Sequence, residues 1–166
     1  DVVRVAGSVS VVYNEHLVIT KSIHVLGGFS GPPDWGREFT TYPSVVDGQG
    51  VGPVVAIANG VTGTLEGFTL RNGQTNADGG VVLVTASSPL ISATVVMSGS
   101  AASGGGMAIH GGAPRIVNST IVSNTAIGGG GILVAEGAVF ELRNTTVAGN
   151  QASLVGGGLL LDSSSL

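Results

Sequence analysis

Charged side chains are scarce in this sequence of 166 residues. They make up 10% of the chain, against about 25% in a typical soluble domain. Only six residues are Lys or Arg, and the formal net charge is −4. Nucleic-acid binding needs a concentrated basic surface, and six scattered cations cannot form one. We therefore predict no nucleic-acid partner.

Cysteine is absent, aromatic residues make up only 4% of the chain, and no long hydrophobic run occurs. Without disulfides to staple a small core, stability must come from a long and regular one. The apolar runs end at glycine well short of the roughly 18–20 residues of a membrane helix, so we predict no membrane insertion. The sequence begins at Asp1 and contains no recognisable signal peptide, so we expect any targeting signal to lie outside these residues.

Glycine is abundant, at 29 residues, and much of it belongs to a motif that repeats. The motif is a glycine run followed by an apolar segment, in four copies: DGGVVLV, GGGMAIH, GGGILVA and GGGLLLD. The first apolar residues of these copies are Val81, Met107, Ile132 and Leu159. A second motif repeats in step with the first: TLEGFTLRNG, LISATVVMSG, RIVNSTIVSN and ELRNTTVAGN. Two motifs that keep one period of about 26 residues indicate an internal structural repeat.

Each half-repeat is a short segment rich in Val, Ile and Thr, bounded by Gly, Asn, Ser or Pro. This pattern predicts a strand between two turns, and no segment has the periodicity of an amphipathic helix. Short strands at this period predict an all-β solenoid whose coils stack about 4.8 Å apart. We expect a single domain over residues 1–166, with about six coils and a loop insertion at residues 28–44.

The units SNTAIGGGGIL and GNQASLVGGGLL, with the N-terminal stretch VRVAGSVSVVYNEHLVITKSIHVLGGFSG, resemble right-handed parallel β-helix proteins. The likeness is to the glycine-rich form found in bacterial secreted and cell-surface proteins, and it covers essentially the whole chain. It implies a right-handed parallel β-helix and an extracellular or cell-surface location. The same scaffold carries lyases, hydrolases, adhesins and passive stalks, so the resemblance does not fix a function. Such proteins usually cap their first coil, whereas this sequence starts and stops within a coil, so we expect both ends to be uncapped.

Stacked coils place equivalent residues in columns, and alternation along a strand then separates inward from outward positions. The predicted inward columns are Val81, Met107, Ile132 and Leu159, and Leu83, Ile109, Val134 and Leu161. The predicted outward column between them is Val82, Ala108, Leu133 and Leu160. Because a continuous apolar stripe usually marks an interaction surface, we predict an assembly face here. Another segment of the same protein or another subunit would cover it.

Asparagine recurs at a turn position, at Asn118 and Asn144. We predict a structural column in which the side-chain amides bond along the stack. Both residues also begin N-glycosylation sequons, but their recurrence at a turn favours the structural interpretation.

The insertion carries three aromatic residues, Trp35, Phe39 and Tyr42. Aromatic side chains on a loop can stack on sugar rings, so these residues are a candidate glycan-binding site. The alternative is that the insertion packs over the first coils and seals them.

The ten acidic residues are scattered, and the column alignment places no two of them at one position of neighbouring coils. Glycoside hydrolases need two carboxyl groups about 5–10 Å apart, and lyases need several carboxylates for Ca²⁺ together with a base. We therefore predict no catalytic residue, no metal site and no cofactor.

The leading hypothesis is an extracellular structural or adhesive protein. It would associate with itself end to end into a filament, or with neighbouring segments of a longer chain. The alternatives are a fragment of a polysaccharide lyase or glycoside hydrolase, and a carbohydrate-binding module with polysaccharide as its partner.

Overall fold

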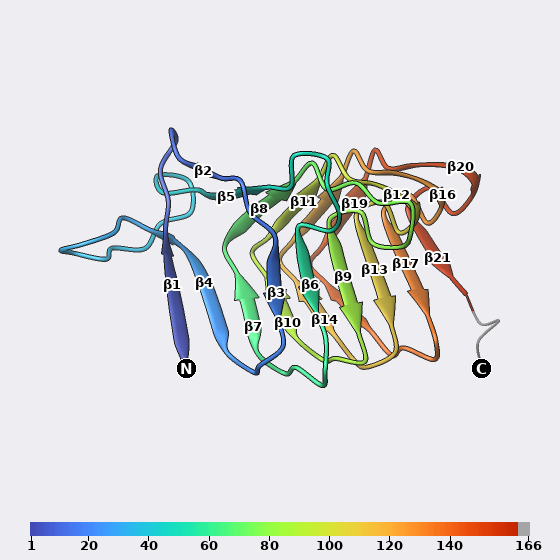
Figure 1. Ribbon diagram of the computed structural model, residues 1–166, viewed down its shortest axis with the longest axis horizontal. Coiled ribbons are helices and arrows are strands. Elements are labelled where there is room, and N and C mark those ends of the chain that lie inside the picture. Colours follow the sequence, from blue (N-terminus) through green and yellow to red (C-terminus); the bar gives the residue numbers. More distant parts are fainter. Residues whose placement is uncertain (163–166) are drawn as a thin grey trace.

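The computed structural model describes residues 1–162, which form a right-handed parallel β-helix (Figure 1). The strands of the front sheet run downward and those behind run upward as the chain advances from left to right. Three parallel sheets have six strands each, which confirms the predicted all-β solenoid of about six coils. The described range contains no helix, and so none that could cross a membrane. The predicted C-terminal boundary, at residue 166, lies outside the described residues.

Each coil contributes one strand to each of these sheets. Sheet A consists of β1 (Val2–Ala6), β4 (His24–Phe29), β7 (Thr64–Glu66), β10 (Leu90–Ser92), β14 (Arg115–Val117) and β18 (Glu141–Arg143). Sheet B consists of β2 (Val12–Tyr13), β5 (Ser44–Asp47), β8 (Phe68–Arg71), β11 (Val95–Met97), β15 (Thr120–Val122) and β19 (Thr146–Ala148). Sheet C consists of β3 (Leu17–Ile19), β6 (Val55–Ile57), β9 (Val82–Thr85), β13 (Met107–His110), β17 (Ile132–Ala135) and β21 (Leu159–Leu161). A shorter sheet D occurs only in the later coils: β12 (Ser100–Ser103), β16 (Thr125–Gly128) and β20 (Gln151–Val155).

Four columns of apolar side chains fill the inside of the solenoid, one from sheet A, one from sheet B and two from sheet C. The sheet A column is Val3, Val25, Leu65, Ile91, Ile116 and Leu142. The sheet B column is Tyr13, Val46, Leu70, Val96, Ile121 and Val147. The sheet C columns are Leu17, Val55, Val82, Met107, Ile132 and Leu159, and Ile19, Ile57, Val84, Ile109, Val134 and Leu161. Their middle members are fully buried, as the alternation of Val, Ile and Leu in each strand requires.

The predicted columns of sheet C are wrong by one residue in the coil of β9. Met107 pairs with Val82 rather than Val81, so Val82 is a buried core residue and not part of the outward column. Leu83, predicted to point inward, takes the outward place beside Ala108. The copies align at the left-handed glycine that opens each corner, which is Gly79 in this coil. Its motif has two glycines instead of three, so Val81 occupies the position of the third glycine.

The residue at the third position of each glycine corner, which is Val81, Gly106 or Gly131, determines which side chain can pack beside it in the interior. A Cβ on Gly106 would lie 2.7 Å from Nδ2 of Asn124, and one on Gly131 would lie 2.9 Å from Nδ2 of Asn150. Where the third position is Val81, the residue facing it is Gly99, whose own Cβ would lie 2.5 Å from Cγ2 of Val81. Each of these corners therefore has room for a valine or an asparagine side chain, but not for both.

The asparagine corners form an internal ladder of hydrogen bonds. Fully buried Asn124 accepts a bond from the Gly99 N–H at 2.8 Å and donates to the Val96 carbonyl oxygen at 3.2 Å. Its Nδ2 also donates to Oδ1 of Asn150 at 2.9 Å, and Asn150 donates in turn to the Ile121 carbonyl oxygen at 2.8 Å. The ladder satisfies backbone groups that would otherwise lie buried without partners.

Candidate functional site

The outward apolar column of sheet C is closed by the chain itself in the later coils. The segments of sheet D lead into the glycine corners, which fold back over sheet C so closely that a Cβ on Gly104 would lie 3.1 Å from Cα of Ala108. A Cβ on Gly128 would lie 3.0 Å from Cδ2 of Leu160. Ala108 is buried and Leu133 is only 4% exposed, so with Leu160 they belong to a second, small core. The cover is therefore a segment of the same chain, which is one of the two predicted possibilities. Ala108, Leu133 and Leu160 do not form an open surface to which another subunit could bind.

The same outer column is open in the first coils, where sheet D is absent. Val18 of β3 occupies the position of Leu133 and is 72% exposed. Ala56 of β6 follows it and is half-buried. The outward face of sheet C therefore changes along the solenoid from an open surface to a closed one.

The insertion projects from the N-terminal end, past β1, between the end of β4 and the start of β5 (Figure 1). Arg37 lies between two aromatic rings, 5.1 Å from the centre of Phe29 and 4.9 Å from the centre of Phe39. Its guanidinium also pairs with Glu66 at 3.0 Å, which fixes the insertion to β7. Hydrogen bonds from Thr41 and Thr40 hold the pKa of Glu38 at about 2, so this loop carboxylate is ionised at neutral pH.

The predicted glycan-stacking residues make contacts within the protein. Trp35 meets the ring of Phe29 edge-on, with ring centres 6.1 Å apart. Phe39 has Arg37 over its ring, and a Cβ on Gly28 would lie 2.9 Å from its Cε1. Tyr42 is half-buried. Trp35 and Phe39 therefore contribute to packing within the protein, and glycan binding by the three residues stays a prediction.

Asn118 and Asn144 lie on the outside of the solenoid at the turn between sheets A and B. Nδ2 of Asn144 donates to Oδ1 of Asn118 at 2.7 Å, along the stack. Both residues have left-handed backbone conformations, as do Gly67 and Ala93 at the same turn of earlier coils. Asparagine adopts this conformation at lower cost than most residues, which is a physical reason for its recurrence here.

One cluster of titratable groups was missed by the column alignment. His110 at the end of β13 has its Nε2 3.3 Å from Oδ2 of Asp78 and its Nδ1 3.3 Å from Oε1 of Glu136. Asp78 immediately precedes the corner glycine that folds back over sheet C, so it reaches His110 from outside its column. No group of three His, Cys, Asp or Glu among the described residues is arranged to hold a metal ion.

Asp47 with Arg71 and Arg115 with Glu141 are further ion pairs between successive coils. Asp47 accepts bonds from Arg71 and Asn72, each at 2.8 Å. Burial alone would raise the pKa of Asp47, but bonds from the Gln49 N–H, Arg71 and Asn72 together hold it below its ordinary value. Arg115 and Glu141 occupy the same column of sheet A on neighbouring coils and pair at 2.7 Å. Hydrogen bonding and charge from Arg115 lower the pKa of Glu141.

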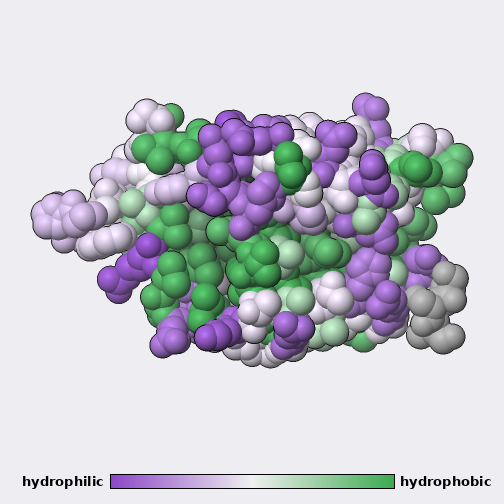
Figure 2. Space-filling model, in the orientation of Figure 1, coloured by the Kyte–Doolittle hydropathy of each residue, from purple (hydrophilic) through white to green (hydrophobic). Residues whose placement is uncertain are grey.

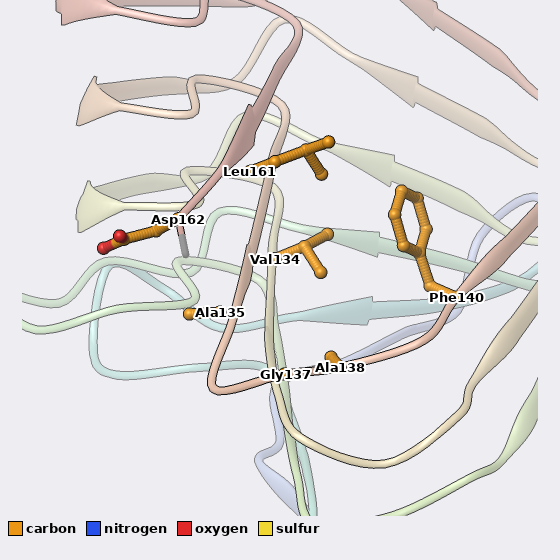
Figure 3. A pocket seen from close by; sticks show the side chains of 7 residues that line it. All are labelled: Val134, Ala135, Gly137, Ala138, Phe140, Leu161 and Asp162. Atoms are coloured by element: carbon orange, nitrogen blue, oxygen red, sulfur yellow. The ribbon is translucent and has the colours of Figure 1, made fainter. Parts of the chain in front are cut away.

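The interior is hollow at both ends of the described solenoid. At the N-terminal end a hollow of about 420 Å³ reaches from Val3 and Ile23 inward to Val46 and Phe68. Figure 2 shows apolar surface in the recess on this side of the molecule. At the other end a hollow of about 230 Å³ is lined by Val134, Leu161 and Phe140, whose side chains face a common space (Figure 3). Both hollows lie where a further coil would place its core side chains.

No protein-family model, curated protein or solved structure matches this chain, so no relative supplies a function for it.

Proposed function

We propose that this chain is a structural or adhesive protein of the extracellular space or cell surface, which assembles end to end with copies of itself. One observation carries the proposal. Sheets A, B and C run unbroken from the first coil to the last described coil, so among the described residues the first and the last strand of each sheet have one unpaired edge. Exposed edges of regular strands offer a row of unpaired N–H and C=O groups to another chain.

Apolar side chains accompany these edges. Leu161 of β21 is 63% exposed although its column is buried in the earlier coils, and Leu159 and Val3 are also exposed. A second copy would bury them and complete the hollows at both ends. Burial of apolar surface is the main favourable contribution to such an association.

The extracellular location rests on the sequence resemblance to glycine-rich β-helix proteins of bacterial surfaces. The low content of charged residues and the repetitive scaffold are in keeping with a structural role.

Sedimentation velocity over a wide range of protein concentrations tests self-assembly. We expect species that grow with concentration, and a Leu161→Lys variant that stays smaller at every concentration because it places a charge in the junction. Lysine at this exposed position leaves the folded core unchanged, and circular dichroism checks this. A wild-type protein that stays a monodisperse monomer throughout would overturn the proposal.

Polysaccharide binding is a second candidate, and the projecting position of the insertion favours it. Half-buried Trp35 on this loop is its most suitable contact for a sugar ring. Glycan arrays of the wild type and a Trp35→Ala variant test it, with Val9→Ala as an exposed apolar control. Binding that is lost only with Trp35→Ala would support this role, and binding that is absent or unchanged would remove it.

A further inference from the structure

We propose that the last coil of one copy stacks on the first coil of the next and that the register of the solenoid continues across this joint. In the joint, β21 of one copy lies beside β3 of the next, and β18 lies beside β1. This inference rests on the proposed end-to-end assembly and adds the partner strand and the pairing of each residue.

At the N-terminal end, β1 and β4 form a projecting part of sheet A, which we call the ledge. In Figure 1, β1 and β4 of the rear sheet extend to the left of β3, the first strand of the front sheet. The inner face of these two strands, with Val3, Val5 and Val25, therefore borders the open hollow of about 420 Å³. A strand that continued sheet C beyond β3 would cover this ledge.

The C-terminal end supplies such a strand. β21 lies beyond β17 at the right of Figure 1, and its core-facing residues Leu159 and Leu161 are exposed. Beside it, Phe140 and Val134 leave a hollow that could receive core side chains of the next coil (Figure 3). At the N-terminal end the inner face of β1 and β4 thus borders an open hollow, and at the other end of the described residues β21 has its apolar side chains uncovered.

The four core columns define one register for the joint. Extended by one coil, they bring Leu142 to Val3, Val147 to Tyr13, Leu159 to Leu17 and Leu161 to Ile19. All eight residues are apolar or aromatic. A slip of one residue would turn each of these side chains to the opposite face, so burial of the core selects this register.

The same register brings two like charges together. Arg143 of β18 occupies the column position of Arg4 of β1, and both residues are exposed. Neighbouring coils of sheet A place side chains within bonding distance, since Arg115 and Glu141 meet at 2.7 Å. Like charges directly opposite each other on adjacent strands are destabilising. The joint should therefore tighten as salt screens Arg4 from Arg143.

Cysteine cross-linking tests the register, because the natural chain has no cysteine. Adjacent strands hold paired Cα atoms about 4.8 Å apart, within the range that a disulfide spans. An Arg4→Cys, Arg143→Cys variant should give a ladder of covalent oligomers under mild oxidation. The matched control, Arg4→Cys with Glu141→Cys, displaces one cysteine by two residues to about 8 Å, so it should give little ladder.

Charge reversal gives an independent measurement. Arg4→Glu replaces the repulsive pair with an attractive one and should lower the protein concentration for half-maximal assembly about fivefold at low salt. Adding Arg143→Glu should restore the weaker assembly. Equal cross-linking in both cysteine variants, or no response to Arg4→Glu, would overturn the register while assembly in sedimentation continued. Absence of assembly in every variant would instead remove the proposed function itself.

Discussion

The two halves of the solenoid fill equivalent interior corners with different chemistry. In the earlier coils Val54 and Val81 occupy the corner, and the facing residues Gly73 and Gly99 leave room for them. In the later coils Asn124 and Asn150 occupy it, and the corner carries Gly106 and Gly131 instead. Small and large residues are exchanged between two positions of the coil, so the interior stays filled while its polarity changes.

The halves also differ in their buried polar contacts and in their outer cover. The buried polar contact of the earlier coils includes a charge, Asp47 with Arg71, whereas the buried contact of the later coils, Asn124 with Asn150, is between neutral amides. Glycine corners lie against the outer face of sheet C from the coil of β9 onward, at Gly79 and Gly104, whereas Val18 on the same face of the first coil is 72% exposed. These differences predict that the two halves respond differently to substitution and to pH.

The largest expected effect is that of Asn124→Ala in the later half. The change leaves the buried Gly99 N–H without its acceptor and removes the bond to the Val96 carbonyl oxygen, so it should lower the free energy of unfolding by about 4 kcal/mol. Oδ1 of Asn150 keeps the bond that it accepts from the backbone N–H of residue 124. Urea unfolding followed by circular dichroism measures this. The exposed ladder gives the control, since Asn118→Gly keeps the left-handed turn accessible, removes only the exposed amide and should cost less than about 1 kcal/mol. Equal losses in the two variants would contradict a specific role for the inner ladder.

Leu133→Ala should lower the free energy of unfolding by about 3 kcal/mol, because the side chain is enclosed between sheet C and the corner that covers it. Val18→Ala, at the equivalent position of the open half, should change it by less than about 0.5 kcal/mol. Thermal or urea unfolding of both variants sharpens the contrast between the covered and uncovered faces. A small loss for Leu133→Ala would show that the cover contributes little.

Gly99→Ala should cost about 2 kcal/mol, because the new methyl group meets Cγ2 of Val81 and the Gly105 carbonyl oxygen. Gly158→Ala is the matched control, since its nearest neighbour would be Cγ1 of Val147 at 3.7 Å, an ordinary contact. We expect that control to be nearly neutral in the same denaturation experiment. If Gly99→Ala were neutral as well, the conclusion that each corner has room for only one of the two side chains, valine or asparagine, would be wrong.

Asp47→Asn should have the smallest effect, about 1 kcal/mol at pH 7, and the effect should depend on pH. The pKa of Asp47 is lowered in the folded protein, so its stabilisation is complete above the ordinary aspartate range and is lost as the pH falls through the lowered value. The difference between wild type and Asp47→Asn should therefore shrink from pH 7 to pH 2. The loss caused by Asn124→Ala should vary much less over this range, because neutral amides do not titrate. Parallel pH profiles for both variants would contradict the distinction between a charged and a neutral buried contact.

The sequence repeat was sufficient to predict the β-solenoid and its number of coils. Alternating Val, Ile and Leu at a period near 26 allows only stacked strands, and the structure has them. The prediction for Val82 is wrong because the first apolar residue does not mark the same position in every copy, since the glycine run before Val81 is one residue shorter. The position that is equivalent in every copy is the glycine with a left-handed backbone, Gly79 in this coil. Its backbone angle cannot be read from the sequence.

Other features depend on how the chain folds back on itself. The corner glycine Gly104, which lies against Ala108, follows the segment Ser100–Ser103, and this segment lacks the β-branched and aromatic residues that identify a strand. Asp78 meets His110 only because the corner returns across sheet C, so a comparison of equivalent positions could not bring them together. The buried ladder had a visible signal, since Asn124 and Asn150 recur 26 residues apart at the end of the second motif.

Helical reconstruction of assembled filaments by electron microscopy tests end-to-end stacking most directly. Six coils spaced by about 4.8 Å predict an axial rise of about 29 Å per molecule, with the strand spacing continuous across each junction. That rise would establish the joint as a continuation of the solenoid. Filaments with a different rise, or an interruption of the strand spacing at every junction, would contradict it.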